Sequence, residues 1–467
     1  MFVQHFFVKG LAHVSYLLGG KENCAIIDPK RDIQDYLDAA KDMGYKITHI
    51  LETHLHADFV SGHMDLAGKT GAKIIAPKAS GCKFEHNAVS DGDEFQIDHL
   101  KIKVIDTPGH TPDGVCYIVT DTSRGEEPAG IFSGDTLFVG DVGRPDLFPG
   151  MADELAEKLF KSLGKIMELP DFVEVYPAHG AGSLCGKAMS AKRTSTIGYE
   201  RRYNNSLKPK TLEEFKKILL AEMPAAPDHF SRCSATNGAG PAYVEKLPKV
   251  KPLSPAEFNK EMENGCLVLD IRSAASFGGQ HIPGSIHIDI TSNFQTFAGW
   301  ILPVEKTLLL VADSEKDVCN AVGQLRRVGL DIVKGWLDGG IHKWAISGLP
   351  LESIKQISVS ELKEMCNKTD FTLLDVRAKR EFDTFHIEGA KHMAAPDTRS
   401  NFNELTGPVF CMCSTGHRSS MAASILKSKG IKDVANVAGG VTGWAAAGFT
   451  QVCPVCQNVH GPEISNA

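Results

Sequence analysis

The chain has no long apolar run. None of its segments approaches the ~20 consecutive apolar residues of a membrane-spanning helix, and the mean hydropathy is −0.13. Basic residues are not in excess: 50 Lys and Arg stand against 57 Asp and Glu, a formal charge of −7 without an electrostatic footprint for nucleic acid. The N-terminus lacks the basic segment and clean apolar core of a secretory signal. We therefore expect a cytoplasmic protein without a membrane or nucleic-acid partner.

Cysteine is too sparse for a disulfide scaffold, with 12 in 467 residues. Most are isolated, and we expect them to be small buried side chains in a reducing compartment. Two pairs differ: Cys411 and Cys413 precede a Ser/Gly-rich turn, and Cys453 and Cys456 lie near the C-terminus. The second pair has no partner pair to complete a four-ligand zinc site, so we assign it no role.

What is present is the composition of an ordinary globular protein, 42% hydrophobic and 23% charged. Its length predicts about three domains. Short apolar runs alternate with helical patterns up to about residue 200, which indicates an α/β fold. Expected strands are 24–29, 49–56, 72–77, 100–110, 130–138 and 172–180, and expected helices are 35–44 and 155–167.

An internal repeat organises the rest of the chain. Residues 267–288 match 372–393, and the identical pairs are spaced by 105 residues: Asp270/Asp375, Arg272/Arg377, Phe277/Phe382, His281/His386 and Gly284/Gly389. Each copy is expected to be a small doubly wound α/β domain. The predicted domains are 1–222, a linker 223–253, 254–350, 357–452 and a tail 453–467.

Histidines and aspartates follow several strand-like runs of the first domain. They are His54, His56 and Asp58 after the run 49–52, and His110, Asp135 and His179 after later runs. Strand ends meet at one edge of an α/β sheet, where ligands bind. Imidazole and carboxylate suit Fe, Zn or Mn, so the pattern predicts a metal site.

These residues resemble the metallo-β-lactamase fold family, whose signature is His-x-His-x-Asp-His with later His, Asp and His ligands. The resemblance implies an αββα sandwich. The chain departs from the signature at Phe59, where the hydrolases of the family have a histidine that helps to hold a second metal ion. Phenylalanine cannot ligate, so a two-metal hydrolytic site is not expected.

The remaining pattern is similar to the persulfide dioxygenase branch, whose members resemble glyoxalase II but hold one ferrous ion. The resemblance implies one Fe(II) per chain, with open positions for O₂ and a substrate sulfur. By the same resemblance the ligands are His54, His110 and Asp135, while His56, Asp58 and His179 orient ligands and water.

Arg144 lies nine residues after Asp135, as in that family. Its guanidinium could bind the anionic persulfide or its product. An ion pair with Asp141 or Asp146 that fixes the loop is an equal alternative.

A second set of chemical residues lies in the second repeat. A strand-like run ends at Cys413, and residues 419–430 are helical. Backbone N–H groups and a helix N-terminus favour a nucleophilic thiolate at such a turn. The six residues from Cys413 to Arg418 resemble the rhodanese active-site loop, Cys-x-x-Gly-x-Arg-Ser, which implies that Cys413 carries a persulfide, that Arg418 assists it, and that the substrate contacts Ser414, Thr415, Gly416 and His417.

The first repeat lacks this chemistry. Alignment on Gly329 and Gly430 places Ala312 at the position of Cys413 and Asp317 at that of Arg418. We therefore expect residues 254–350 to be an inactive rhodanese-like domain.

The hypothesis is an Fe(II)-dependent persulfide dioxygenase fused to a sulfurtransferase in sulfide detoxification. Glutathione or coenzyme A persulfide would be oxidised with O₂ to sulfite, and Cys413 would form or cleave thiosulfate. One alternative is a glyoxalase II-type thioester hydrolase with a fused sulfurtransferase, and another is a sulfur carrier that works only through Cys413. The resemblance also implies a homodimer or homotetramer.

Overall fold

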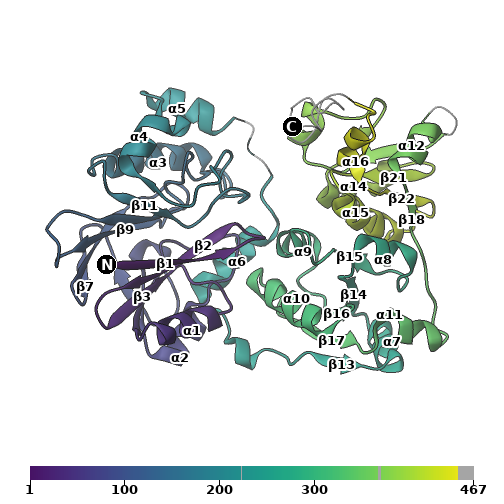
Figure 1. Ribbon diagram of the computed structural model, residues 1–467, viewed down its shortest axis with the longest axis horizontal. Coiled ribbons are helices and arrows are strands. Elements are labelled where there is room, and N and C mark those ends of the chain that lie inside the picture. Colours follow the sequence, from purple (N-terminus) through teal and green to yellow (C-terminus); the bar gives the residue numbers. More distant parts are fainter. Residues whose placement is uncertain (222, 224, 367–369, 451–467) are drawn as a thin grey trace, which may run out of the picture. The chain divides into compact units, whose positions relative to one another are not determined.

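The structure is a computed structural model, and it describes all residues except 222, 224, 367–369 and 451–467. The predicted tail with Cys453 and Cys456 therefore lies outside the described residues. The chain forms two compact units (Figure 1), Met1–Leu247 with Leu325–Gly329, and Pro248–Gln324 with the chain from Leu330 onward. No helix within the described part of the chain is long and apolar enough to cross a membrane.

The first unit is built on two six-stranded sheets. One has the order β1-β2-β3-β4-β5-β6, with β1 (Phe2–Val8), β2 (His13–Gly19), β3 (Asn23–Ile27), β4 (Lys46–Leu51), β5 (Lys73–Pro77) and β6 (Asn87–Val89). The other has the order β12-β11-β10-β9-β8-β7, with β7 (Glu94–Ile97), β8 (Leu100–Asp106), β9 (Val115–Asp121), β10 (Gly130–Gly134), β11 (Glu174–Pro177) and β12 (Ser195–Thr196). Each strand expected from the sequence is found, but β4, β8 and β10 end before the expected residues 56, 110 and 138, so His54, His56 and His110 lie in loops.

Helices of the first unit cover the outer faces of both sheets, except for α6, which packs against the loop after β4. They are α1 (Gln34–Asp42), α2 (His63–Thr70), α3 (Ala152–Ile166), α4 (Ile197–Tyr203), α5 (Leu212–Leu219) and α6 (His229–Ala239), with short 3₁₀ turns at Lys78–Ser80, Asn205–Leu207 and Val244–Lys246. Since successive strand residues point to opposite faces, Ile26 packs outward against α1 while Ile27 packs into the core between the sheets. In the other sheet, Ile131 packs outward against α3 and Phe132 packs into the core between the sheets. The αββα sandwich is confirmed.

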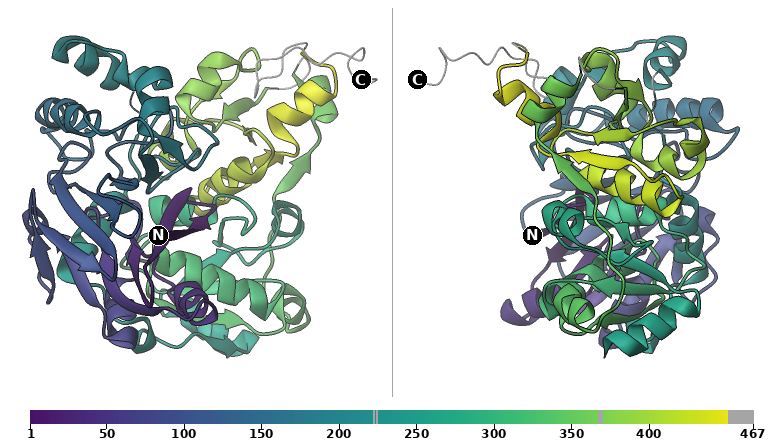
Figure 2. Two further views of the ribbon diagram at one scale, coloured as in Figure 1. Left: turned by 60° about the vertical axis from the view of Figure 1, so that its left-hand side comes forward. Right: turned by 90° about the vertical axis from the view of Figure 1, so that its right-hand side faces the viewer.

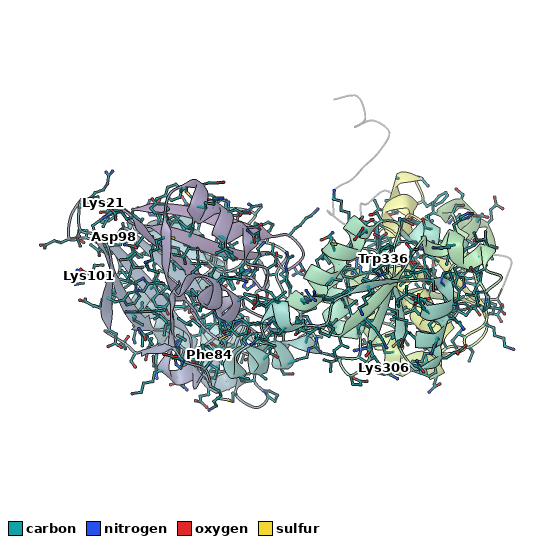
Figure 3. The ribbon with its side chains drawn as sticks, turned by 90° about the horizontal axis from the view of Figure 1, so that it is seen from below. Lys21, Phe84, Asp98, Lys101, Lys306 and Trp336 are labelled. Carbon is teal, nitrogen blue, oxygen red and sulfur yellow. The ribbon has the colours of Figure 1, made fainter. Side chains whose placement is uncertain are left out.

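Asp98 ties the two sheets together at one edge of the sandwich. It lies between β7 and β8, and Figure 3 labels it beside Lys21. Its carboxylate accepts hydrogen bonds from the backbone N–H groups of Lys21 (2.7 Å), Glu22 (2.8 Å) and Asn23 (2.9 Å) in the β2–β3 turn. One exposed carboxylate therefore satisfies three backbone donors at the turn of the other sheet.

Helix α6 lies in the segment 223–253 that the sequence analysis expected to be a linker. Its Asn237 is buried and donates hydrogen bonds to the carbonyls of His56 (2.9 Å) and Phe59 (2.8 Å), and it accepts one from Ser61 N–H (2.8 Å). The Gly-, Ala- and Pro-rich composition suggested a connection, but the small side chains let this helix approach the loop closely. The segment up to Leu247 belongs to the first unit and supports the loop after β4.

The second unit contains two five-stranded parallel sheets with one topology. The orders are β13-β17-β16-β14-β15 and β18-β22-β21-β19-β20. The strands are β13 (Lys251–Leu253), β14 (Leu267–Asp270), β15 (Ile286–His287), β16 (Leu308–Val311), β17 (Val333–Leu337), β18 (Lys355–Ile357), β19 (Thr372–Asp375), β20 (Lys391–His392), β21 (Val409–Met412) and β22 (Val434–Val437).

Helices lie on both faces of these sheets (Figure 2). They are α7 (Pro255–Glu263), α8 (Ala274–Gly279), α9 (Phe294–Ile301), α10 (Glu315–Arg327), α11 (Gly340–Ile346), α12 (Val359–Met365), α13 (Lys379–Thr384), α14 (Thr398–Asn401), α15 (His417–Ser428) and α16 (Gly440–Ala446), with 3₁₀ turns at Ala395–Asp397 and Phe402–Glu404. The predicted pair of doubly wound α/β domains is confirmed.

The two repeats share a buried ion pair with the same geometry. The Nε of Arg272 lies 2.9 Å from Asp270 Oδ1 and its Nη2 lies 2.6 Å from Oδ2, and Arg377 and Asp375 repeat both distances. Each aspartate ends a central strand and each arginine donates to the following helix end as well. The matched residues found in the sequence are therefore scaffold residues in both copies.

Candidate metal centre and sulfur-transfer loop

Three buried ligand atoms converge at the strand ends of the first unit. His54 follows β4, His110 follows β8 and Asp135 follows β10. Asp135 Oδ2 lies 3.3 Å from His110 Nε2 and 3.9 Å from His54 Nε2, and none of these three atoms has a hydrogen-bond partner in the described structure. Unsatisfied buried polar atoms are costly, and three that face one another fit a metal ion. The structure thus brings together the three residues predicted as ligands.

Neighbouring groups orient the two histidines. His110 Nδ1 lies 2.8 Å from the carbonyl oxygen of Arg144, and His54 Nδ1 lies 2.9 Å from Thr53 Oγ1. Burial lowers the pKa of both His54 and His110, so both imidazoles are neutral, the form that binds a metal ion. Each ring is therefore fixed with Nε2 toward the ligand cluster.

His179 bridges two carboxylates beside the cluster. Its Nδ1 lies 2.7 Å from Asp135 Oδ1 and its Nε2 lies 2.9 Å from Asp58 Oδ2. Burial alone would raise the pKa of Asp135, but His179 outweighs this effect and holds that pKa well below its usual range. Asp135 is thus kept ionised, with Oδ2 turned to the two histidines. The predicted orienting role of Asp58 and His179 agrees with this geometry.

His56 points away from the metal cluster. Its Nε2 lies 3.1 Å from Asp28 Oδ1 and 3.6 Å from Glu52 Oε2. Burial lowers the pKa of His56, but these carboxylates outweigh it and raise the value to about 9, which protonates the ring. Phe59 is fully buried, and its ring centre lies 4.5 Å from that of His56. The position at which the family's hydrolases have a histidine for a second metal ion is therefore filled by a buried phenylalanine, and His56 is grouped with Asp28 and Glu52.

Sequence reasoning missed Cys185. Its thiol forms a group with Asp58 and His179 in which the ligand atoms lie within 4.8 Å of one another. Burial raises the pKa of this thiol well above its usual value. Its position six residues after His179 was the only signal in the sequence, and an isolated cysteine gave no reason to use it.

A cavity of about 640 Å³ opens beside the ligand loop. Leu55 and Ala57, which alternate with His54 and His56, form one side of it. The small residues Ser231, Ser234, Ala235, Gly238 and Ala239 of α6 form another side. Lys83 is the one charged side chain among its lining residues, so the cavity suits a molecule with apolar surface and an anionic group.

Arg144 forms an ion pair with Asp146, which was one of the two roles expected for it. Its Nε and Nη2 each lie 2.7 Å from a carboxylate oxygen of Asp146, and its Nη1 donates to the carbonyl of Leu184 (3.1 Å). The side chain is buried. Asp141, the other candidate partner, instead accepts the backbone N–H groups of Lys187 and Ala188 (both 2.7 Å). Substrate binding by Arg144 stays a prediction.

Cys413 lies at the end of β21 beneath a turn. Its side chain is buried, and its Sγ accepts hydrogen bonds from Gly416 N–H (3.1 Å) and Ser419 Oγ (3.3 Å). Helix α15 begins at His417, so its N-terminus faces the same loop. Both hydrogen bonds and the helix end stabilise a thiolate.

Arg418 is held by a residue that the sequence analysis did not identify. The carboxylate of Glu381, on α13, accepts hydrogen bonds from Nη1 (2.6 Å) and Nη2 (2.7 Å) of Arg418. Ser414 Oγ lies 2.8 Å from Arg418 Nη2. His417 Nδ1 lies 3.1 Å from Asp289 of the first repeat, and Thr415 is exposed. The substrate contacts predicted for this loop remain predictions.

The first repeat keeps the path of this loop without its chemistry. Ala312 follows β16 as Cys413 follows β21, because Asp270 pairs with Val311 where Asp375 pairs with Met412. Gly440 has φ +54°, and a Cβ there would lie 2.1 Å from the carbonyl oxygen of Cys413. Gly340, with φ +59°, has the same neighbour but a looser approach: a Cβ there would lie 3.3 Å from the carbonyl oxygen of Ala312.

Comparisons with known proteins agree with this arrangement. A metallo-beta-lactamase superfamily model matches residues 8–179, and a rhodanese-like domain model matches 254–347 and 358–447. A crystal structure of a metallo-beta-lactamase from Staphylococcus aureus subsp. aureus COL is 35% identical with a TM-score of 0.65, over 72% of this chain and 98% of that one. The chain belongs to the metallo-beta-lactamase superfamily, with two rhodanese-like domains fused to the metal-binding domain.

Named relatives divide between two activities. A persulfide dioxygenase from Bos taurus is 30% identical over 44% of this chain and 75% of its own length. A hydroxyacylglutathione hydrolase from Rhizobium meliloti is 37% identical over 31% of this chain, and one from Brucella anthropi is 39% identical over 30%. The chain spans about half the length of these two hydrolases.

Proposed function

We propose that the protein is an Fe(II)-dependent persulfide dioxygenase that also transfers sulfur through Cys413. The observation that carries this proposal is the ligand cluster: His54, His110 and Asp135 each turn one unsatisfied atom to a common point. His56 belongs to a different group, with its Nε2 3.1 Å from Asp28 Oδ1. Two neutral imidazoles and one carboxylate suit ferrous iron and leave positions free for O₂ and a substrate sulfur. The similarity to a persulfide dioxygenase supports the same activity.

The chain's own residues hold and shield the reactants. The cavity beside Leu55 receives the organic part of a thiol persulfide, such as glutathione or coenzyme A persulfide, and Lys83 attracts an anionic group of it. His179, between Asp58 and Asp135, keeps the ligand carboxylate oriented and ionised. The overall reaction is RSSH + O₂ + H₂O → RSH + SO₃²⁻ + 2H⁺.

Sulfur transfer completes the proposed function. The Cys413 thiolate attacks the outer sulfur of a second thiol persulfide, RSSH; the S–S bond breaks, RSH leaves, and Cys413 becomes a persulfide, which Gly416 N–H and the start of α15 stabilise. Sulfite then attacks the outer sulfur: the S–S bond breaks, thiosulfate leaves, and Cys413 returns to the thiolate. The reverse direction supplies persulfide from thiosulfate.

The test is O₂ consumption by anaerobically purified protein loaded with Fe(II) and given glutathione persulfide, with metal content measured on the same sample. We expect rapid uptake, sulfite release and about one iron per chain. His110→Ala is expected to lose the metal and the uptake, whereas His99→Ala, a change of another histidine in the same unit, is the matched control. About two metals per chain with cleavage of a glutathione thioester and no O₂ uptake would contradict the proposal and favour the hydroxyacylglutathione hydrolase alternative.

A further inference from the structure

Asp289 lies in the repeat without a nucleophile, and its carboxylate accepts several hydrogen bonds from its own domain. Its Oδ1 accepts hydrogen bonds from the N–H (2.9 Å) and Oγ1 (2.7 Å) of Thr291, and its Oδ2 accepts one from Ala274 N–H (3.2 Å). Its side chain is 3% exposed. A buried carboxylate held by three donors of its own domain has one fixed orientation.

That orientation points a carboxylate oxygen at the sulfur-transfer loop of the other repeat. Oδ2 of Asp289 lies 3.1 Å from Nδ1 of His417, and helix α15 packs beside β15 in this unit (Figure 1). A second contact between the repeats lies next to it: Ser420 Oγ is 2.9 Å from Nδ1 of the buried His287. The first repeat therefore touches the active loop through side chains, one of them charged.

The charges of this contact are complementary. The hydrogen bond to Asp289 raises the pKa of His417. Burial would raise the pKa of Asp289, but His417 and Thr291 outweigh it and hold that pKa well below its usual range. A protonated histidine at the first position of a helix is unfavourable beside the helix dipole, so it needs such a partner. Asp289 makes an imidazolium possible at this place.

The carboxylate is absent from the corresponding position of the active repeat. The 105-residue offset that aligns His287 with His392 aligns Asp289 with Ala394. The backbone confirms the register, since Ile288 N–H donates to Asp270 O and Met393 N–H donates to Asp375 O, both at 3.1 Å. The first repeat has lost the nucleophile but carries a charged residue that serves its neighbour.

We infer that Asp289 is a positioning residue for sulfur transfer: it holds the His417 imidazolium on the rim of the Cys413 loop, where the ring binds a sulfur oxyanion. His417 keeps 40% of its side chain exposed, against 23% for Arg418, whose guanidinium is already paired with Glu381. With Nδ1 committed to Asp289, Nε2–H is left for the ligand. Sulfite and thiosulfate share the required chemistry, a small anion with several acceptor oxygens. This inference rests on the proposed sulfur transfer at Cys413.

The test uses the full-length protein and the reaction S₂O₃²⁻ + CN⁻ → SCN⁻ + SO₃²⁻, with thiosulfate varied. Asp289→Asn and His417→Gln are each expected to raise KM for thiosulfate roughly tenfold and to leave kcat within about twofold, because a charged hydrogen bond is lost from binding. A purely structural defect would instead reduce the active fraction, which lowers kcat and leaves KM unchanged. Asp338→Asn, which removes an exposed charge of the same repeat, is the matched control.

The double variant separates the two residues. If Asp289 acts through His417, Asp289→Asn adds no further change in KM to His417→Gln. Additive changes in KM in the double variant, or an unchanged KM in both single variants, would overturn the inference. Thiocyanate formation by the wild type would still support the proposed sulfur transfer. Thiocyanate formation that is equal in wild type and Cys413→Ser would overturn both. If Asp289→Asn does not fold, His417→Gln, which changes a half-exposed side chain, still tests the oxyanion contact, and an unchanged KM in that variant alone overturns the inference.

Discussion

The two rhodanese-like repeats have one scaffold and different loops. Both keep the strand order, the buried Asp–Arg pair and the glycine that closes the loop. The differences are concentrated around one point, where Cys413, Arg418 and Glu381 of the second repeat correspond to Ala312, Asp317 and Ser276 of the first. Fold stability and sulfur chemistry therefore depend on separate sets of residues in this domain.

The largest expected effect is the loss of sulfur transfer on changing the nucleophile. Cys413→Ser should reduce thiocyanate formation from thiosulfate at least ~1,000-fold, because a hydroxyl does not form a persulfide under these conditions. Metal content and O₂ uptake with glutathione persulfide should remain. Ala312→Cys in the same background should restore nothing, because Asp317 and Ser276 offer no cation and no partner for one. Recovery of turnover would show that the first loop needs only its thiol.

Breaking the shared scaffold should affect both repeats equally. Arg272→Met and Arg377→Met each leave a buried aspartate unpaired, and each should cost about 3–5 kcal/mol of unfolding free energy. All four tryptophans, at 300, 336, 344 and 444, lie in the second unit. Urea unfolding followed by tryptophan fluorescence therefore reports on this unit. A large effect in one repeat only would mean that the copies do not share their source of stability.

Glu381→Gln tests the partner of Arg418 and should lower sulfur transfer about tenfold, because the bidentate charged contact is weakened.

The ion pair between Glu381 and Arg418 also predicts a pH dependence of the free energy of unfolding. Burial would raise the pKa of Glu381, but Arg418 outweighs it and lowers that pKa. The stabilisation is thus present above the unfolded value of about 4.3 and is lost as the pH falls through the folded value. Wild type should lose more stability than Glu381→Gln on acidification below about pH 4.3, as urea titrations at several pH values would show; parallel curves would contradict this.

The smallest expected effects are those of the helix caps. Ser254 and Ser358 begin α7 and α12 with the same capping box, completed by Glu257 and Glu361. Ser254→Ala and Ser358→Ala should each lower the urea midpoint by an amount that corresponds to about 1 kcal/mol. Unequal decreases in the urea midpoint would indicate that packing contacts, and not the cap, stabilise the start of one of the two helices.

Much of this molecule could be predicted from local sequence signals. The period of apolar residues indicated the strands, and polar residues at strand ends indicated a metal site, because a sheet gathers the ends of its strands. The resemblance to the persulfide dioxygenase branch then selected His54, His110 and Asp135 as the ligands. Cys413 was found because its loop has a compact pattern. Each of these signals lies within about ten consecutive residues.

The rest depended on contacts between distant residues. Asp289 reaches His417 across 128 residues, and Glu381 reaches Arg418 across 37. Asn237 of α6 supports the ligand loop from a segment whose composition suggested a linker. No pattern along the chain marks such pairs, because each residue alone has the features of an ordinary surface or helix residue.

The glycines at 340 and 440 affect how an activity is inferred from membership of a family. A side chain at either place would collide with, or crowd, a backbone carbonyl of the loop, whether that loop carries a thiol or a methyl group. The fold of the loop therefore favours a glycine at this place whether or not the nucleophile is present. Sequence similarity at such structural positions is the same for an inactive copy as for an active one. The residue at the position of the nucleophile therefore has to be checked separately in every repeat.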